Sequence, residues 1–274
     1  MRSSRTKVVS ILSIAVLTLC FTPFSAAQAE TLRIGGTGSA TVLMERLGAA
    51  FAASEAGTTV EIIPGLGSSG SIAAAMDNVL DLAISARPLK PAETGLSEVA
   101  AMRTPYGLVS SNPNPGDITS ADVAAFFSSP TSTWADGSPV RVILRPRNES
   151  DTALLGQTFP GMETAIDQVR ERVDVPIAAT DQDNLEMAKA IDGSLVGTSL
   201  AQVVTERHQI QFLTIDGVEP TLENLDNGQY PYTKLYRFIY AENSTPLVQR
   251  FLAFVNSGDG AILLREAGCL RTVQ

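Results

Sequence analysis

Two short loops rich in glycine and serine constrain the fold of this chain most, because each lies between an expected strand and an expected helix. The first loop covers residues 35–41 (GGTGSAT) and follows the apolar run at 32–34. The second covers residues 64–70 (PGLGSSG) and follows the run VEII at 60–63. A strand that turns through glycines into a helix leaves the first N–H groups of that helix unpaired, and the helix dipole adds partial positive charge there. The two turns therefore predict two places where a small anion can bind.

Strand-like and helix-like segments alternate along the rest of the chain. This alternation predicts an α/β fold in which each sheet is mixed but mainly parallel and is flanked by helices. We expect strands at 31–35, 58–63, 81–85, 106–110, 140–145, 174–178, 195–199, 210–215 and 234–240. We expect helices at 40–54, 70–78, 119–127, 151–158, 161–171, 183–190, 200–206, 221–226, 246–256 and 259–266.

The run SNPNPG at residues 111–116 interrupts this pattern near one third of the chain. We predict two lobes joined by two crossings. Lobe 1 covers 30–108 and is completed by 236–274, and lobe 2 covers 109–235. The crossings at 106–112 and 234–240 are the expected hinge, and the expected ligand cleft lies between the lobes, where strand ends and helix starts meet.

The first 29 residues have the pattern of a signal peptide. Arg2, Arg5 and Lys7 form a positive start, residues 8–21 are apolar, and Ala27-Gln28-Ala29 fits the small-residue cleavage rule. We therefore expect a soluble protein that is periplasmic or secreted after removal of this segment. Cys269 is the one cysteine beyond residue 29, so the mature chain is expected to have no internal disulfide.

The charge balance disfavours one class of partner. The chain has 20 Lys and Arg against 29 Asp and Glu, a net charge of −9, and no basic stripe that would bind nucleic acid. A small anion is still possible, because dipoles and one or two arginines act on it at short range. His208 is the single histidine and is expected at the surface, so no metal site, cofactor or catalytic residue is predicted.

The second loop contains G-x-G-x-x-G at residues 65–70, a pattern also found in dinucleotide-binding proteins. That function needs an acidic residue about 20 positions further on, and the segment SARPLK at 85–90 has none. Glycines that serve only the turn are the second alternative. We favour an anion cradle, because Ser68, Ser69 and Ser71 add hydroxyl donors to the backbone amides.

Three arginines are candidates for the anion-binding cation. Arg87 follows the apolar strand LAIS at 82–85 and could clamp an oxyanion, although a surface salt bridge is equally compatible with its position. Arg145 and Arg147 stand in a third loop, 145–152 (RPRNESDT), and only one of the two is expected to point inward. Ser150 or Asp151 is the expected N-cap of the helix that follows.

Together these motifs resemble the phosphate-binding proteins of ABC importers. The resemblance is carried by IGGTGSAT at 34–41, GLGSSGS at 65–71, DLAISARPLKP at 81–91 and the pattern R-P-x-x-x-S-D-T at 145–152. LTIDGVEPT at 213–221, GQYPY at 228–232 and FLAFVNSGDG at 251–260 extend it over nearly the whole mature chain. It implies a type II periplasmic binding fold whose lobes close on a dehydrated oxyanion.

The resemblance also implies the ligand-binding residues. The family's first loop maps onto Ser39, Ala40 and Thr41, its second onto Ser68, Ser69 and Gly70, and its arginine loop onto Arg145, Ser150 and Thr152. With the residues favoured by the loops themselves, the expected ligand-binding set is Thr37, Gly38, Ser39, Ala40, Thr41, Ser68, Ser69, Gly70, Arg87, Arg145, Ser150, Asp151 and Thr152.

The chain departs from the family at two positions. Well-known members have, at the end of the third strand, an aspartate that accepts a hydrogen bond from protonated phosphate, and this chain has Arg87 in that region; Asp151 stands where a glycine is common. Our hypothesis is that Asp151 supplies the missing acceptor and so discriminates against sulfate, which has no proton to donate.

We therefore expect an extracytoplasmic solute-binding protein that captures an inorganic oxyanion, first of all phosphate, for an ABC permease in the inner membrane. It is expected to be a monomer and not an enzyme. The alternatives are a phosphate-ester hydrolase, which the lone histidine and the absence of a G-x-S-x-G elbow disfavour, and an oxyanion sensor that reports to a signalling receptor.

Overall fold

A computed structural model describes residues 30–272, so the expected signal peptide lies outside the described residues. The strands are β1 (Glu30–Gly36), β2 (Thr58–Ile63), β3 (Leu82–Ser85), β4 (Leu96–Ser110), β5 (Asp117–Ile118), β6 (Arg141–Val142), β7 (Ser194–Ser199), β8 (Gln211–Phe212), β9 (Thr214–Ile215), β10 (Thr233–Ala241) and β11 (Leu270–Arg271). The helices are the short 3₁₀ turn η1 (Gly38–Ala40), α1 (Thr41–Ser54), α2 (Gly67–Met76), α3 (Val123–Ser128), α4 (Ser150–Thr158), α5 (Met162–Arg170), α6 (Asp181–Ala190), α7 (Leu200–Thr205), α8 (Leu222–Asp226), α9 (Pro246–Val255) and α10 (Gly258–Glu266).

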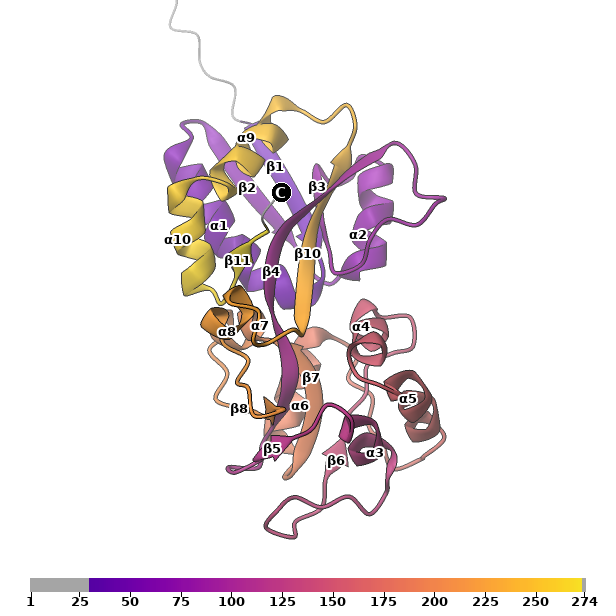
Figure 1. The fold of residues 1–274 in the computed structure, drawn as a ribbon. Coiled ribbons are helices and arrows are strands. Elements are labelled where there is room, and N and C mark those ends of the chain that lie inside the picture. The colour runs from indigo at the N-terminus through magenta and orange to yellow at the C-terminus, as the bar shows by residue number, and fades with distance from the viewer. Residues whose placement is uncertain (1–29, 273–274) are drawn as a thin grey trace, which may run out of the picture.

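A long strand connects the two halves of the molecule (Figure 1). The main sheet has the order β2-β1-β3-β10-β4-β7-β6. The first part of β4 pairs with β10 as far as Pro105, and its last part, Tyr106–Val109, pairs with β7. The chain therefore passes from the upper to the lower half of Figure 1 inside one continuous strand.

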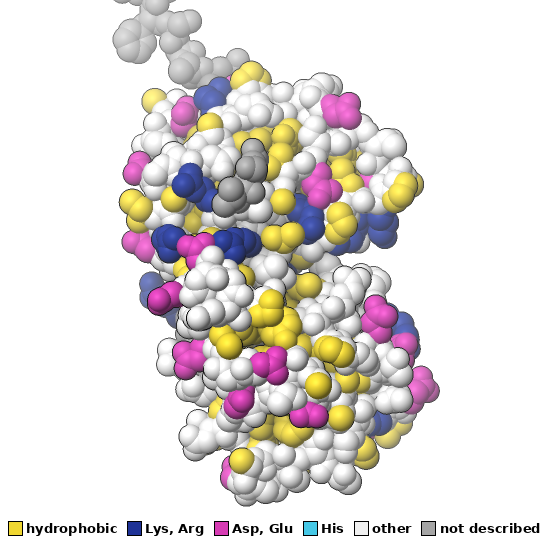
Figure 2. Space-filling view, viewed as in Figure 1, with side chains coloured by type: hydrophobic (Ala, Val, Ile, Leu, Met, Phe, Trp, Pro, Cys, Tyr) yellow, Lys and Arg dark blue, Asp and Glu magenta, His cyan; other side chains and the backbone are white. Residues whose placement is uncertain are grey.

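Apolar side chains form a separate core in each half. In the upper half, Leu43, Leu47 and Phe51 lie on one face of α1 and pack with β1, β3, β10 and α9. In the lower half, Tyr106 and Leu108 of β4 pack with side chains of α3, α4 and α5. The space-filling view shows two masses that meet at a narrower waist (Figure 2). The mixed α/β fold and its two lobes agree with the expectation from the sequence, whereas the exact lobe boundaries stay a prediction.

Several expected elements differ from the structure. Residues 174–178 form no strand and contribute only an isolated bridge between Ile177 and Leu144. The strand expected at 140–145 is reduced to β6, and α2 begins at Gly67, three residues earlier than expected. The sheet is less parallel than expected, because β10 pairs antiparallel with both β3 and β4, and β4 pairs antiparallel with β7.

One glycine fixes how closely two strands can approach. A Cβ atom at Gly36, the last residue of β1, would lie 2.2 Å from the carbonyl oxygen of Ile84 in β3. Only glycine allows this approach, and the N–H of Thr37 then donates to the same Ile84 oxygen at 2.9 Å. The first glycine-rich loop is thereby held against the end of β3, with η1 and α1 starting at the waist.

Candidate functional site

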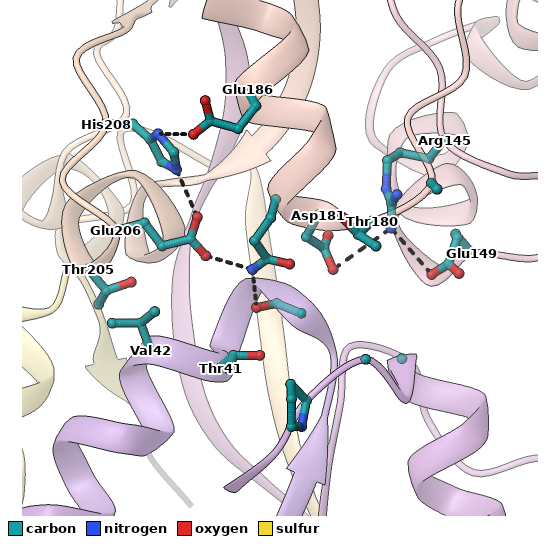
Figure 3. A pocket seen from close by; sticks show the side chains of 16 residues that line it. Thr41, Val42, Arg145, Glu149, Thr180, Asp181, Glu186, Thr205, Glu206 and His208 are labelled. Atoms are coloured by element: carbon teal, nitrogen blue, oxygen red, sulfur yellow. Dashed lines mark hydrogen bonds and ion pairs between the residues drawn. The ribbon is translucent and has the colours of Figure 1, made fainter.

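A cavity of about 570 Å³ lies between the two halves (Figure 3). From the upper half it is lined by the start of η1 and α1 and by the loop that leads into α2. From the lower half it is lined by the loop before α4, the start of α6 and the segment after α7. Its lining residues are Gly38, Thr41, Val42, Pro64, Gly65, Gly67, Arg145, Glu149, Ala179, Thr180, Asp181, Gln182, Glu186, Thr205, Glu206 and His208.

Arg145 is the one arginine that lines this cavity. Its side chain is only 8% exposed, and its Nη1 donates to the carbonyl of Ala178 at 2.7 Å. Its Nη2 lies 3.6 Å from Glu149 Oε2 and 3.8 Å from Asp181 Oδ2, both longer than a hydrogen bond. Its Nε is buried without a partner among the described residues. The guanidinium group therefore keeps hydrogen-bonding capacity at Nε and at Nη2, whose two ion pairs are long.

The other two candidate arginines lie elsewhere. Both terminal nitrogens of Arg87 bond to Glu93, at 2.9 and 2.6 Å, and its Nε donates to Ser69 Oγ at 3.2 Å. This pair lowers the pKa of Glu93. The Arg147 side chain is 64% exposed and pairs with Asp167 at 2.7 Å. Of the two arginines in the third loop, Arg145 is the one that points inward.

Carboxylates from the lower half face the helix starts of the upper half. A Cβ atom at Gly38, the first residue of η1, would lie 2.6 Å from Asp181 Oδ2, and one at Gly67, the first residue of α2, would lie 3.8 Å from Glu149 Oε2. Negative groups are favoured at such helix starts. Burial and the negative charge of Asp151 raise the pKa of Asp181 to about 6, against the opposing effects of Lys234 and Arg145.

Beside the cavity, Lys234 is buried completely at the start of β10. Its Nζ donates to Ser39 Oγ at 2.7 Å and to Asp151 Oδ1 at 2.6 Å. Burial alone would lower the pKa of Lys234, but Asp151 and other neighbours raise it above its usual value. Tyr236 Oη lies 3.3 Å from Ser39 Oγ and 3.0 Å from Ser199 Oγ. This cluster brings the first and third sequence loops together.

Hydroxyl groups of the second and third loops also meet across the waist. Ser68 Oγ and Ser150 Oγ are 3.1 Å apart, and the N–H of Ala86 donates to Ser68 Oγ at 3.0 Å. In the first loop, Thr37 Oγ1 and Ser39 Oγ are 3.3 Å apart. The structure thus brings Ser68 to Ser150, and Ser39 to Asp151 through Lys234, while Gly38 and Thr41 line the cavity itself.

The remaining expected site residues do not reach the cavity. Ser69 and Gly70 are exposed on α2, and Ala40 is packed into the upper core. The Thr152 hydroxyl donates to the carbonyls of Pro146, at 2.8 Å, and Arg145, at 3.3 Å. It thereby stabilises the third loop from within.

The far end of the cavity holds a histidine–glutamate network. His208 Nε2 lies 2.8 Å from Glu206 Oε2 (Figure 3). Gln182 Nε2 donates to Glu206 Oε1 at 2.8 Å and to the Gly38 carbonyl at 3.0 Å. The His208 side chain is only 7% exposed, so the expected surface position was wrong. The segment around it is polar, but Glu206 and Glu186 lie against the two ring nitrogens, at 2.8 and 3.9 Å.

Sequence reasoning missed Lys234, Glu149, Asp181, Gln182 and Glu206. The one local signal was at Asp181, since Thr180 and Asp183 form a capping box that marks the start of α6. Lys234 gave no signal, because its partners Ser39 and Asp151 are 195 and 83 positions away.

Within residues 30–272, no cluster of three or more His, Cys, Asp and Glu side chains has a metal-binding arrangement. In the same part of the chain, no helix combines the length and apolarity needed to cross a membrane.

Comparison with known proteins gives the family. No curated protein matches the chain. A protein of Clostridium perfringens assigned as a phosphate ABC transporter substrate-binding protein, solved with bound phosphate, aligns with a TM-score of 0.75 at 21% identity, covering 89% of this chain and 100% of that one. A phosphate-binding protein named PfluDING, also bound with phosphate, gives 0.68 at 14% identity, covering 88% of this chain and 90% of that one.

An ABC-type phosphate transport receptor from Vibrio cholerae gives a TM-score of 0.63 at 16% identity, covering 87% of this chain and 99% of that one. At these identities the structures establish a shared fold. The sequence profile of the PBP superfamily domain matches residues 22–259. The chain therefore belongs to the PBP superfamily.

Proposed function

We propose that this chain is an extracytoplasmic solute-binding protein that captures an oxyanion for an ABC permease, with inorganic phosphate as the first candidate. The observation that carries the proposal is Arg145. It is a buried arginine in an interlobe cavity, and its Nε and Nη2 form no hydrogen bond within the described part of the chain. A planar guanidinium with free donors matches the paired oxygens of a phosphate or carboxylate group.

The surroundings of Arg145 support this proposal. The helices α1, α2, α4 and α6 all begin at the waist, so their unpaired N–H groups and dipoles converge on the cavity. The similar solved structures include proteins with bound phosphate. The superfamily is one of binding proteins, which favours capture over hydrolysis.

Calorimetric titration of the mature protein with phosphate and with sulfate tests the proposal. Arg145→Ala should weaken phosphate binding by about 2–5 kcal/mol, because the guanidinium is desolvated together with the ligand. Arg147→Ala is the matched control. It removes the same side chain two positions away, where it is exposed and paired only with Asp167.

Equal affinities for wild type, Arg145→Ala and Arg147→Ala would remove Arg145 from the site.

A separate variant, Asp151→Asn, tests whether Asp151 discriminates phosphate from sulfate. Asp151 Oδ1 already accepts from Lys234, so a hydrogen bond from protonated phosphate would need its second oxygen. A preference for phosphate over sulfate that survives Asp151→Asn would rule this role out.

A further inference from the structure

The interlobe cavity carries far more negative than positive charge. Its lining contains four carboxylates, Glu149, Asp181, Glu186 and Glu206, against one arginine and one histidine. Two of these carboxylates already lie at helix starts of the upper half, Asp181 at Gly38 and Glu149 at Gly67. A cavity with this balance attracts a bare anion weakly, because the protein's own carboxylates already satisfy part of its positive potential.

Among the described residues, the Asp181 carboxylate accepts no hydrogen bond, and its one ion pair is a long contact with Arg145. Its side chain is 9% exposed, and within the described residues no side chain or backbone N–H donates a hydrogen bond to its carboxylate. The nearest cationic atom is Arg145 Nη2, 3.8 Å away. Glu206, in contrast, accepts from Gln182 and Gln202 and lies 2.8 Å from His208 Nε2. A buried carboxylate without a donor is costly unless a ligand supplies one.

Arg145 and Asp181 therefore form only a long ion pair with each other, and each keeps hydrogen-bonding capacity for a ligand. Arg145 offers donors to an oxyanion, and Asp181 needs a positively charged donor. We infer that the ligand of this cleft is a small zwitterion, whose oxyanion group binds Arg145 and whose ammonium group, one or two bonds away, binds Asp181. This inference rests on the proposed capture of an oxyanion and replaces inorganic phosphate by an organic zwitterion as the substrate class.

The size of the cavity agrees with an organic ligand. About 570 Å³ lies within the range of 300–1,000 Å³ typical of sites for organic molecules and leaves room beyond Arg145 towards Gln182 and His208. Two kinds of zwitterion share the required chemistry, aminoalkyl phosphonates and amino acids. They differ only in the oxyanion group, so matched probe pairs can separate them.

Calorimetry with the mature protein tests the inference. The probes are methylphosphonate against aminomethylphosphonate, acetate against glycine, and inorganic phosphate. In at least one pair, the compound with the ammonium group should bind at least tenfold more tightly than its partner. Asp181→Asn should abolish that preference, while the affinity for the partner without the ammonium group stays the same or increases.

Glu186→Gln is the matched control, because it removes one negative charge from the same cavity at a side chain that is 64% exposed and paired with Lys189. It should leave the preference intact. Thermal unfolding curves confirm that each variant is folded. If Asp181→Asn and Glu186→Gln lost the preference for the ammonium compound equally, the preference would come from the overall charge of the cavity. That result would overturn the role of Asp181.

The outcomes separate this inference from the proposed function. Tight phosphate binding without an ammonium preference in either pair overturns the zwitterion and leaves the proposed function standing. Glycine binding without any phosphate or phosphonate binding supports the zwitterion and removes phosphate as the substrate. No binding of any of the five probes to folded protein overturns both.

Discussion

At the scale of single residues, Asp181 makes stability depend on pH. Its pKa is raised from 3.8 to about 6 in the folded protein, mainly by burial and then by Asp151. The folded state therefore holds a proton on Asp181 more tightly than the unfolded state does, so the stability that this group contributes is full below pH 4 and is lost as the pH rises to 6. Above pH 6 the ionised Asp181 is a net cost in the absence of ligand.

Asp181→Asn should therefore increase the free energy of unfolding at pH 7.5 by roughly 1–3 kcal/mol, since each pKa unit corresponds to about 1.4 kcal/mol. The gain should shrink as the pH falls and vanish near about pH 3, below the unfolded-state pKa of 3.8, where both states of the wild type are protonated. Urea unfolding of the ligand-free protein at the two pH values measures this. Asp77→Asn, at an exposed residue after α2, should show no such gain. A destabilised Asp181→Asn at pH 7.5 would mean that Arg145 compensates the charge fully.

At the scale of elements, the buried pair Lys234–Asp151 connects β10 to α4. Lys234→Met should destabilise the protein by about 3–5 kcal/mol, because it leaves Asp151 buried beside an apolar group. Asp151→Asn added to Lys234→Met should recover most of that loss, since neither side chain is then charged. A double-mutant cycle in urea measures the coupling energy.

Lys189→Met is the control for the loss of a lysine. Its Nζ pairs with Glu186 at 2.8 Å on the surface of α6, where an exposed pair contributes about 1 kcal/mol at most. If Lys234→Met were no more costly than Lys189→Met, the charge of Lys234 would be dispensable for the fold. If the double variant were no more stable than Lys234→Met, the loss would come from packing around β10.

At the scale of elements, the sequence predicts those features that depend on local patterns. The two glycine-rich turns, the inward arginine loop and most helices follow from local patterns, because glycine, capping residues and apolar spacing act within a few positions. The first part of β4 escaped prediction, since it contains Pro105 and no regular alternation of apolar residues. The negative charge of the cavity could not be predicted either, because Lys234, Asp181 and Glu206 contact residues that are far away in the sequence.

At the scale of the whole molecule, few polar contacts join the two lobes at the cavity. Ser68 in α2 contacts Ser150 in α4, and Gln182 in α6 donates to the Gly38 carbonyl. Both contacts can be removed without leaving a buried polar group unpaired. Ser68 keeps its bond from the Ala86 N–H, and Glu206 keeps Gln202 and His208. The strands β4 and β10 would still connect the lobes.

The double variant Ser150→Ala, Gln182→Ala should therefore open the ligand-free protein without unfolding it. Two hydrogen bonds contribute roughly 1–3 kcal/mol, which is enough to shift an equilibrium between open and closed lobes by about tenfold or more. Small-angle X-ray scattering should show a larger radius of gyration than for the wild type. Ser132→Ala, Gln168→Ala makes the same chemical change away from the cavity and should leave the radius unchanged. An unchanged radius in the first variant as well would place the closing force in the Lys234 cluster, because Lys234 reaches both Ser39 in η1 and Asp151 in α4.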